Sequence, residues 1–522
     1  MQEPKMKHLM QGAWMLSLAA LIAKVLSAVY RVPLQNLVGD TGFYVYQQVY
    51  PIYGIGMTFA LSGFPVYISK LVAQARQPDA QAVVAHRSIV LLTWLSLVMF
   101  AGLYGFAPTI AWAMADRGLT PLIQMVAFMF LVMPVLATGR GYFQGTFDMS
   151  KTAISQVVEQ VIRVAVILVA AIMATRWHWP VYRMGTVAMS GAIFGGIAAA
   201  VTIFPAFHPI LKRRFAWPGF GAYWQLLRRF VTEGGNIALF AAMLIILQLV
   251  DSFTVTRGLV NSGVTEAAAR SLKGVYDRGQ PLVQLGLVVA TALSATLLPS
   301  MTAALARGQR RRFKAVAAQL IRFNLALSMA ATCGLIVLMP DINHLLFGDT
   351  SGDLALQCYV VAIALVAMIN AYNAILQSRG QFSGTTRTLA IGFVVKLGSN
   401  QWLVTRFNTL GASISTVLAL AVITVLLAHQ VPSEIRRAAD AGHFYGKLAL
   451  CLAAMMAAVA LVAWVISGQS RLIAVITALI GVVVGVLVFI AGADLTALFS
   501  AKEVLNLPLG RRFLKWRSRH GR

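Results

Sequence analysis

The stretch LSLAALIAKVLSAVYRVPL (residues 16–34) has the length and apolar composition of a membrane-spanning helix, yet it carries Lys24 and Arg31. About 20 apolar residues cross the ~30 Å hydrocarbon layer of a bilayer as an α-helix. A lysine in that layer costs about 2.5 kcal/mol or more unless water, a partner or a cavity relieves it. The stretch therefore predicts a membrane helix with a cation that needs a counterpart.

Similar apolar runs recur from one end of the chain to the other. The 522 residues are 59% hydrophobic and 11% charged, whereas soluble domains are about 25% charged. The short alternating segments typical of membrane β-barrels are absent. We therefore predict an all-α polytopic membrane protein. The cysteines lie in apolar segments without metal-ligand or disulfide spacing, so no metal or cofactor is expected.

The sequence predicts about 14 transmembrane helices, at 9–30, 43–69, 88–107, 119–139, 153–175, 185–206, 231–252, 279–300, 320–340, 354–376, 388–405, 409–429, 447–467 and 472–492. A short turn at Phe407 and Asn408 separates the eleventh from the twelfth. Lys and Arg are about three times as frequent in the connections on one side as on the other. Because cytoplasmic loops carry this excess, both termini are predicted to lie in the cytoplasm.

The net charge of +26 follows the same asymmetry. Its basic clusters, 212–214, 310–312 and 511–522, lie on the predicted cytoplasmic side, where anionic membrane lipids attract them. This distribution argues against nucleic acid as a partner.

An internal repeat relates the two halves of the chain. ALSGFP (60–65) recurs as ALSATLLP (292–299), and Arg163 matches Lys396. Since each half holds an even number of predicted spans, the halves share one orientation, as in transporters built from parallel repeats. We predict two six-helix lobes plus two extra C-terminal helices. The predicted bounds are 1–215 for the N-terminal lobe, 222–430 for the C-terminal lobe, 445–495 for the extra helix pair and 496–522 for a basic cytoplasmic tail.

No enzymatic motif is present. The sequence lacks a phosphate-binding GxxxxGK[ST] loop, an HExxH metal motif and a GxSxG nucleophile elbow. The chain is therefore not expected to be an enzyme. Channels and receptors stay open as alternatives, but a two-lobe repeat favours a transporter that alternates between the two sides.

Two cations of the first helix are candidate site residues. Lys24 and Arg31 are two helical turns apart, on one face and about 10 Å from each other along the axis. They could line a cationic cavity that binds an anionic head group. Alternatively, Lys24 pairs with a carboxylate and Arg31 reaches the membrane interface.

Other candidates lie further along the chain. Glu159 and Arg163, at i and i+4, either neutralise each other or line the cavity. Lys396 lacks an acidic neighbour of that kind, and Asp251 is a candidate gate or interface carboxylate. The remaining candidates are Arg278, at the predicted outer mouth of the second half, and Gln144, which the repeat matches with Gln377. The aromatic run at 43–53 could be an interfacial belt.

A family resemblance is carried by the stretches AKVLSAVYRVPLQNLVGDTGFYVYQQVYPIY (23–53), GFPVYISKLVAQ (63–74), RGYFQGTFDMSKTAISQVVEQVIRV (140–164), NSGVTEAAARSLKGVYDRGQPLVQL (261–285) and LPSMTAAL (298–305). They resemble the multidrug/oligosaccharidyl-lipid/polysaccharide (MOP) flippase superfamily, and within it the SpoVB and MurJ-like polysaccharide biosynthesis proteins of Gram-positive bacteria. The resemblance covers nearly the whole chain.

The resemblance implies a flippase that moves lipid II, the undecaprenyl-diphosphate-linked peptidoglycan precursor, to the outer leaflet of the bacterial plasma membrane. In this family, cations on the first helix and at the start of the eighth line a central cavity and bind the diphosphate. Lys24, Arg31 and Arg278 fall on those positions, whereas the family's arginine on the second helix has no match in GIGMTFALSG (54–63). The resemblance also implies a membrane potential or a coupling ion as the driving force.

Three alternatives remain. The first is a flippase for another polyprenyl-linked polysaccharide or a spore-cortex precursor. The second is a cation-coupled multidrug exporter, which the scarcity of acidic residues in the spans disfavours. The third is a scaffold of cell-wall synthesis without transport activity.

Overall fold

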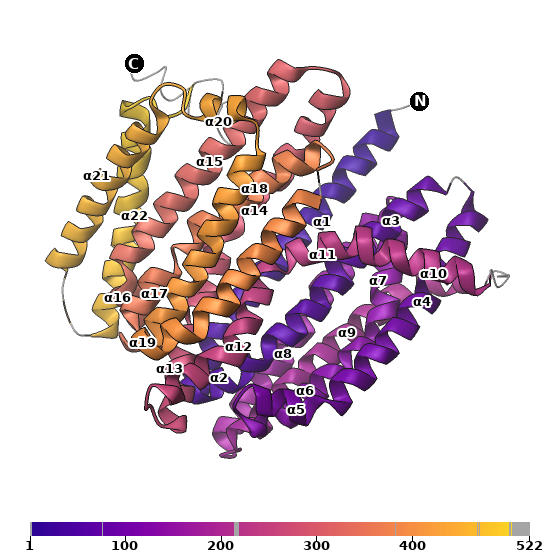
Figure 1. Ribbon diagram of the computed structural model, residues 1–522, viewed down its shortest axis with the longest axis horizontal. Coiled ribbons are helices and arrows are strands. Elements are labelled where there is room, and N and C mark those ends of the chain that lie inside the picture. The colour runs from indigo at the N-terminus through magenta and orange to yellow at the C-terminus, as the bar shows by residue number, and fades with distance from the viewer. Residues whose placement is uncertain are drawn as a thin grey trace. The chain divides into compact units, whose positions relative to one another are not determined.

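Figure 1 shows the computed structural model of the protein, which describes residues 3–75, 77–212, 219–381, 383–466, 468, 470–500 and 503. Helices follow one another along this part of the chain, and it contains no β-strand. The predicted all-α class is therefore confirmed. Most of the predicted basic tail at 496–522, and residues 213–214 of the first basic cluster, lie outside the described residues.

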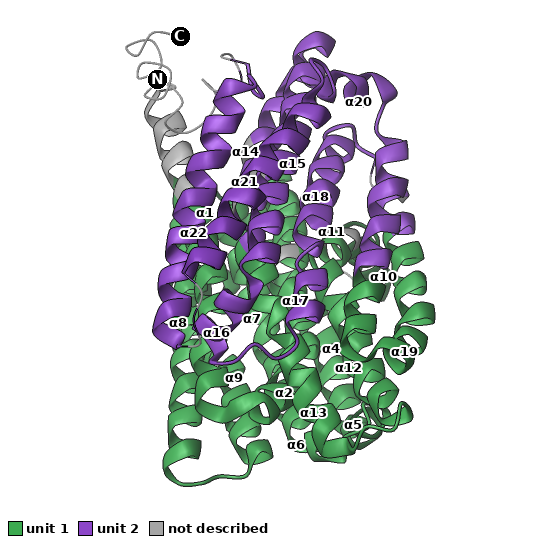
Figure 2. Ribbon diagram, turned by 90° about the vertical axis from the view of Figure 1, so that its left-hand side faces the viewer, with its two compact units in different colours: residues 1–285, 389–416 green, residues 286–388, 417–522 purple. Residues whose placement is uncertain are grey.

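The chain divides into two compact units, which Figure 2 shows in different colours. Unit 1 comprises residues 1–285 and 389–416, and unit 2 comprises residues 286–388 and 417–522. All the candidate site residues belong to unit 1. The lobe bounds 1–215 and 222–430 come from the sequence repeat and remain a prediction.

Unit 1 contains thirteen complete α-helices and three short helical turns among its described residues. They are α1 (Glu3–Val29), α2 (Arg31–Thr58), η1 (Phe59–Gly63), α3 (Phe64–Gln74), α4 (Pro78–Gly105), α5 (Ala107–Ala113), η2 (Arg117–Leu119), α6 (Thr120–Ala127), α7 (Met129–Gly145), α8 (Met149–Arg176), α9 (Val181–Leu211), α10 (Phe220–Arg229), η3 (Phe230–Gly234), α11 (Gly235–Ala241), α12 (Met243–Asn261) and α13 (Glu266–Asp277).

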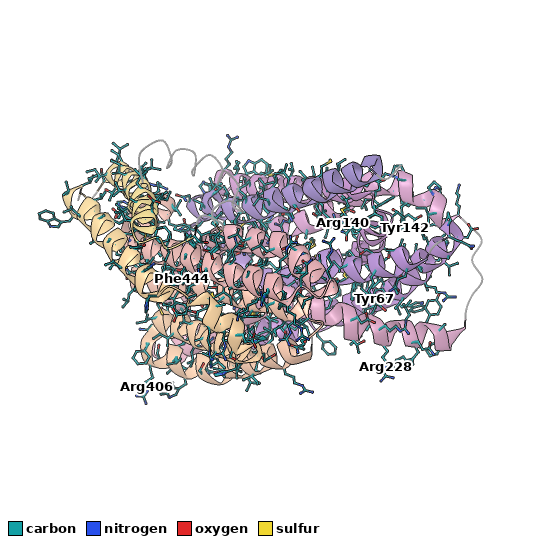
Figure 3. The ribbon with its side chains drawn as sticks, turned by 90° about the horizontal axis from the view of Figure 1, so that it is seen from above. Tyr67, Arg140, Tyr142, Arg228, Arg406 and Phe444 are labelled. Atoms are coloured by element: carbon teal, nitrogen blue, oxygen red, sulfur yellow. The ribbon has the colours of Figure 1, made fainter. Side chains whose placement is uncertain are left out.

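Two long helices, α14 (Gly279–Ala306) and α19 (Ser383–Gln430), contribute residues to both units. The remaining helices of unit 2 are α15 (Arg310–Val337), α16 (Met339–Phe347), α17 (Asp353–Tyr359), α18 (Ala362–Ser378), α20 (Ser433–Ala439), α21 (Phe444–Val465) and α22 (Arg471–Leu495). Within unit 2, Arg322 of α15 binds Glu503 at 3.1 Å, and its guanidinium also covers the ring of Phe444, which Figure 3 labels.

Twelve helical segments of the described chain are long and apolar enough to cross a membrane. Two of them, Met15–Thr58 with 44 residues and Gly384–Gln430 with 47, each cover two predicted spans. A helix of 44 residues would be about 66 Å long, roughly twice the hydrocarbon thickness. The predicted number of 14 spans therefore depends on how these two segments cross the membrane, and it remains a prediction.

Both long segments contain a backbone break. Gly39 interrupts α2 with φ of 68°, and Asn408 interrupts α19 with φ of 52°. Left-handed values such as these are accessible to glycine and tolerated by asparagine. The predicted turn at Phe407 and Asn408 is thus confirmed.

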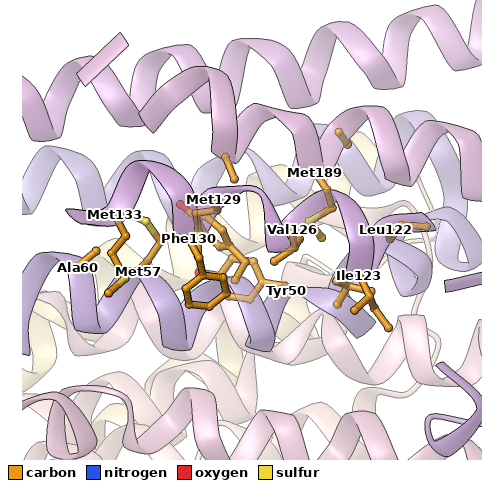
Figure 4. Close-up of a cluster of buried hydrophobic side chains, with 14 of the residues drawn as sticks. Tyr50, Met57, Ala60, Leu122, Ile123, Val126, Met129, Phe130, Met133 and Met189 are labelled. Atoms are coloured by element: carbon orange, nitrogen blue, oxygen red, sulfur yellow. The ribbon is translucent and has the colours of Figure 1, made fainter. Parts of the chain in front are cut away.

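The core of unit 1 is rich in aromatic and methionine side chains. Figure 4 shows part of it, where Tyr50 and Met57 of α2 lie near Met129, Phe130 and Met133 of α7. Two glycines let α9 approach α8 closely: a Cβ at Gly191 would lie 2.9 Å from the Arg163 carbonyl oxygen, and one at Gly195 would lie 2.7 Å from that of Glu159. This GxxxG spacing brings helix backbones together in membranes, and here it fixes the segment that carries both candidate residues.

Candidate functional site

Six cationic side chains are buried among the residues that the structure describes, and all of them belong to unit 1. They are Arg31, Arg140, Arg163, Lys273, Arg278 and Lys396. Taking an isolated charge out of water costs several kcal/mol, so buried cations normally have a carboxylate partner. The partners of these six therefore show which cations are structural and which have capacity left for a ligand.

Lys396 has the most complete set of partners. Its Nζ lies 2.6 Å from Asp251 Oδ1 and donates to Thr416 Oγ1 at 2.6 Å, to Asn400 Oδ1 at 3.0 Å and to the Ala412 carbonyl at 3.2 Å. The other oxygen of Asp251 accepts from the Tyr276 hydroxyl at 3.0 Å. We call Asp251, Tyr276, Lys396, Asn400 and Thr416 the lysine network. Its polar groups satisfy one another, so it is suited to a structural role.

Three more cations are held by carboxylates. Arg140 Nη2 binds Glu159 at 2.7 Å, Lys273 binds Asp277 at 2.5 Å, and Arg278 Nη2 binds Asp40 at 2.7 Å. The first pair joins α7 to α8, the second joins two residues one turn apart on α13, and the third joins the turn between α13 and α14 to α2. The backbone of α13 also approaches α2 closely, because a Cβ at Gly274 would clash with the Asp40 carbonyl.

Arg31 and Arg163 form no ion pair with a carboxylate within the described part of the chain. None of the three guanidinium nitrogens of Arg31 has a hydrogen-bond acceptor there. Arg163 donates only to neutral groups, to Gln160 Oε1 at 2.6 Å and to Ser27 Oγ at 3.4 Å. Both guanidinium groups instead lie against tyrosine rings.

Those rings belong to Tyr30, Tyr50 and Tyr53. Together with Tyr46, whose hydroxyl lies 2.9 Å from that of Tyr30, we call them the tyrosine cage. The Arg31 guanidinium lies 4.4 Å from the ring centre of Tyr50 and 5.9 Å from that of Tyr30. The Arg163 guanidinium lies 4.9 Å from Tyr53 and 5.8 Å from Tyr30. Aromatic faces stabilise a cation by only about 0.5–2 kcal/mol, so they compensate the burial of the two arginines incompletely.

The predicted candidates therefore have different environments. Lys24 is exposed on α1, whereas Arg31, two helical turns further on, is fully buried. The expectation that Arg31 reaches the membrane interface is wrong, because α2 and its tyrosines enclose it. The belt interpretation of the aromatic run is wrong for Tyr46, Tyr50 and Tyr53, which lie inside unit 1.

The expected mutual neutralisation of Glu159 and Arg163 is also wrong. Glu159 points to Arg140 of α7, whose guanidinium also binds Ser155 one helical turn before Glu159. Lys396 finds its carboxylate in Asp251 of α12 rather than on its own helix. Gln144 is partly buried at the end of α7, and no hydrogen bond joins its side chain to the other candidates among the described residues.

Sequence reasoning missed several residues of this cluster, among them Arg140, Lys273, Asp277 and Asp40. Asp277 stands next to Arg278 and interacts electrostatically with Arg31 and Asp251. Local signals existed for some of them: Lys273 and Asp277 are i and i+4, and Asp40 follows the helix-breaking Gly39. No local signal pairs Asp40 with Arg278, which is 238 residues away.

Apolar helices of membrane-spanning length and a buried polar cluster within one unit define a multi-pass membrane protein of the transporter type. The chain belongs to the polysaccharide biosynthesis protein family, whose pattern matches residues 9–305. Its fold is that of the MOP superfamily. It resembles a lipid II flippase MurJ in an inward closed conformation (TM-score 0.70, 12% identity, 92% of this chain and 98% of that one). It also resembles a multidrug resistance MATE family transporter (TM-score 0.64, 14% identity, 80% and 96%).

Relatives in Bacillus subtilis confirm the predicted SpoVB and MurJ-like resemblance. An uncharacterized membrane protein, YabM, is 32% identical over 98% of this chain and 96% of its own length. The lipid II flippase MurJ is 26% identical over 78% and 80%. Stage V sporulation protein B is 25% identical over 81% and 83%. The relatives with a named activity are flippases and transporters, not enzymes.

Proposed function

We propose that the protein is a flippase that moves an undecaprenyl-diphosphate-linked saccharide, with lipid II as its leading substrate, from the inner to the outer leaflet. Transport would proceed by alternating access through a cationic central cavity. The relative named lipid II flippase and the family's link to polysaccharide biosynthesis support this class of substrate. The location in a bacterial plasma membrane, with both termini in the cytoplasm, is part of the proposal.

The observation that carries the proposal is the unmatched pair Arg31 and Arg163. Four of the six buried cations have carboxylates at 2.5–2.7 Å, and these two have none among the described residues. Guanidinium groups bind phosphate through two parallel hydrogen bonds. A diphosphate offers enough oxygens for both arginines.

Burial of these arginines gives the anion a thermodynamic role. An unsatisfied buried polar group costs about 1–3 kcal/mol, and a charged one more. A diphosphate that reaches Arg31 removes this penalty, so it favours the conformation in which the tyrosine cage opens to the cavity. The polyprenyl tail can remain in lipid while only the polar head enters the cationic cavity.

The other candidates complete the proposed pathway. Lys24, exposed on α1, would meet the incoming head group before Arg31 does. Arg278, held by Asp40, would become available where that pair separates. Asp251, Lys396 and Glu159 belong to ion pairs that connect helices, whereas Arg163 would bind the diphosphate together with Arg31. Gln144 remains a candidate cavity residue. A membrane potential or a coupling ion would supply the driving force, and anionic lipids would meet the basic clusters.

The proposal is tested with purified protein in proteoliposomes, by following the appearance of lipid II in the opposite leaflet. Arg31→Gln keeps a polar side chain but loses the charge and the fork of donors. Because charge-assisted hydrogen bonds contribute about 1.5–3 kcal/mol each, we expect transport to fall at least tenfold. Arg406→Gln is the matched control, since Arg406 also lies against an aromatic ring, that of Trp402 at 5.7 Å, but is exposed and projects outward in Figure 3.

An Arg31→Gln variant as fast as the wild type, at equal abundance in the membrane, would contradict the cavity assignment. A parallel assay uses an undecaprenyl-diphosphate-linked glycan without the stem peptide. If this glycan moves and lipid II does not, the substrate is another polyprenyl-linked saccharide. If neither lipid moves with or without an imposed membrane potential, the flippase proposal fails.

A further inference from the structure

A second polar site lies in unit 1, away from the tyrosine cage. It is a pocket of about 610 Å³ formed by the α5–η2 turn, the start of α9, the end of α12 and the start of α13. Figure 1 shows α5, α6 and α13 at the end of unit 1 opposite to the N-terminal end of α1. The volume lies within the range of about 300–1,000 Å³ that is usual for ligand sites.

Three arginines, Arg117, Arg257 and Arg270, line this pocket together with the carboxylates Asp116 and Glu266. Arg270 is occupied by both carboxylates, at 3.3 Å from Asp116 and 3.2 Å from Glu266. Asp116 also accepts hydrogen bonds from the hydroxyls of Tyr182 and Tyr44 and from the Gly118 amide. The two carboxylates are thus engaged by protein groups, and the pocket, with three arginines and two carboxylates, retains one net positive charge.

Arg117 and Arg257 have donors left for a ligand. Among the residues that the structure describes, Arg257 makes one hydrogen bond, from Nη2 to the Ala113 carbonyl at 3.1 Å, and a guanidinium has five N–H donors. Arg117 is exposed at the pocket. Beside them, Trp112 is 58% exposed and its ring faces the Arg257 guanidinium at 6.0 Å.

We propose that this pocket binds a saccharide that carries a carboxylate or a phosphate. Arg117 and Arg257 would bind the anionic group, since the guanidinium fork matches the geometry of both anions. The Trp112 ring offers a flat apolar face for the C–H side of a sugar ring. The Lys and Arg bias predicts this end of the protein outside the cell, so the ligand would come from the outer medium.

The two walls of the pocket come from different halves of the sequence repeat. Trp112, Arg117 and Tyr182 belong to the first half, whereas Arg257 and Arg270 belong to the second. A ligand held by Arg117 and Arg257 together would tie the walls to each other and favour the state in which this end of unit 1 is closed. The site would therefore slow transport when acidic saccharide accumulates outside, whichever lipid-linked substrate is carried.

Calorimetric titration of the full-length protein in phosphatidylcholine nanodiscs tests the site, with glucuronic acid, glucose 6-phosphate, glucose and inorganic phosphate as probes. We expect the two acidic sugars to bind at least tenfold more tightly than glucose, and more tightly than phosphate alone. Arg257→Gln should weaken their binding about tenfold, the loss of one charge-assisted contact. Arg183→Gln is the matched control, because Arg183 is exposed and lies over Trp179 at 4.5 Å but does not line the pocket.

Equal affinity for glucose and glucuronic acid, or an Arg257→Gln variant that binds like the wild type, would overturn the proposal.

Nanodiscs with phosphatidylglycerol distinguish an acidic saccharide from an anionic lipid headgroup as the ligand of the pocket. If this lipid lowers the affinity for glucuronic acid in the wild type but not in Arg257→Gln, the pocket is a lipid headgroup site and the saccharide assignment fails. A second readout is hydrogen exchange of residues 266–277, which glucuronic acid should slow in the wild type and leave unchanged in Arg257→Gln. No step requires lipid II or transport, so the result is independent of the proposed flippase activity.

Discussion

The lysine network and the tyrosine cage bury cations at positions that the sequence repeat matches, but in opposite ways. Lys396 lies among four oxygen atoms, one of which belongs to a carboxylate. Arg163 has a glutamine, a serine and two aromatic rings. Arg31, beside it, lies against the rings of Tyr50 and Tyr30 and has no carboxylate within salt-bridge distance in the described part of the chain.

The presence or absence of a carboxylate partner distinguishes buried cations suited to hold helices together from those with donors left for a ligand. A cation whose donors are all used by fixed oxygens gains little from a ligand, and removing it strands a carboxylate. A buried guanidinium with unused donors gains a great deal from an anion. The second half of the repeat therefore holds Lys396 as a structural connection between α12 and α19. The matching Arg163 of the first half, with Arg31 beside it, has no such carboxylate among the described residues, and these two are the cations that we propose bind the substrate.

The largest expected effect comes from breaking the lysine network. Lys396→Met leaves Asp251 buried without its cation, which should lower the free energy of unfolding by about 3–5 kcal/mol. SDS titrations of the purified protein in mixed micelles measure this change. The double variant Asp251→Asn with Lys396→Met removes both charges and should recover most of the loss. Equal instability of the single and the double variant would show that the ion pair is not what holds α12 and α19 together.

The next largest loss of stability is expected from breaking the ion pair of Arg140 and Glu159 in the first half of the repeat. Glu159→Gln strands the Arg140 guanidinium at 0% side-chain exposure and should cost about 3 kcal/mol in the same titration. Arg140→Met with Glu159→Gln should restore much of the stability. This result would show that carboxylate pairing, rather than position in one half or the other, decides which cations are structural. A Glu159→Gln variant as stable as the wild type would remove that distinction.

The all-α class and the positions of the helices could be predicted from the sequence, because the relevant signals are local and repeated. Each predicted span overlaps a helix of the structure, since about 20 apolar residues without charges have no other stable form in a bilayer. The break at Asn408 was predicted for a similar reason, because a polar residue capable of a left-handed conformation interrupts an apolar run. The break that divides the 44 residues of Met15–Thr58 could not be predicted in this way, because Gly39 is one of many glycines in the sequence.

The pairing of charges could not be predicted in the same way. The i, i+4 spacing of Glu159 and Arg163 suggested a pair, but a helix has several faces and α7 presented Arg140 to the same carboxylate. Likewise, Asp251 and Lys396 lie far apart in the chain and meet only through the packing of α12 against α19. Partner choice among buried charges is a property of tertiary contacts, so sequence spacing alone suggested a Glu159–Arg163 pair that the structure does not contain.

The third prediction concerns Arg163, a buried cation that forms no ion pair among the described residues. Arg163→Met removes a cation that has no carboxylate to strand, so the free energy of unfolding should fall by only about 1 kcal/mol, the loss of its aromatic and neutral contacts. Transport of lipid II in proteoliposomes should nevertheless fall at least tenfold. Arg163→Lys retains the charge without the planar fork and should fall between the two. A loss of stability as large as that of Lys396→Met would mean that both halves hold their cations structurally.

The smallest effect on stability is expected at Lys24. Its side chain is exposed, and exposed substitutions usually change stability by less than about 0.5 kcal/mol. Transport should still distinguish Lys24→Ala, which loses the cation, from Lys24→Arg, which retains it and should keep part of the activity.

Cysteine substitutions make the contrast with Arg31 direct: a water-soluble maleimide should label Lys24→Cys rapidly and Arg31→Cys slowly, since residue 31 is enclosed by the tyrosine cage. If lipid II accelerates labelling at residue 31 but not at residue 24, the cage opens for its substrate. Equal labelling of both positions without lipid II would show that the cage is open at rest, and Arg31 would then lose the penalty that is proposed to favour diphosphate binding.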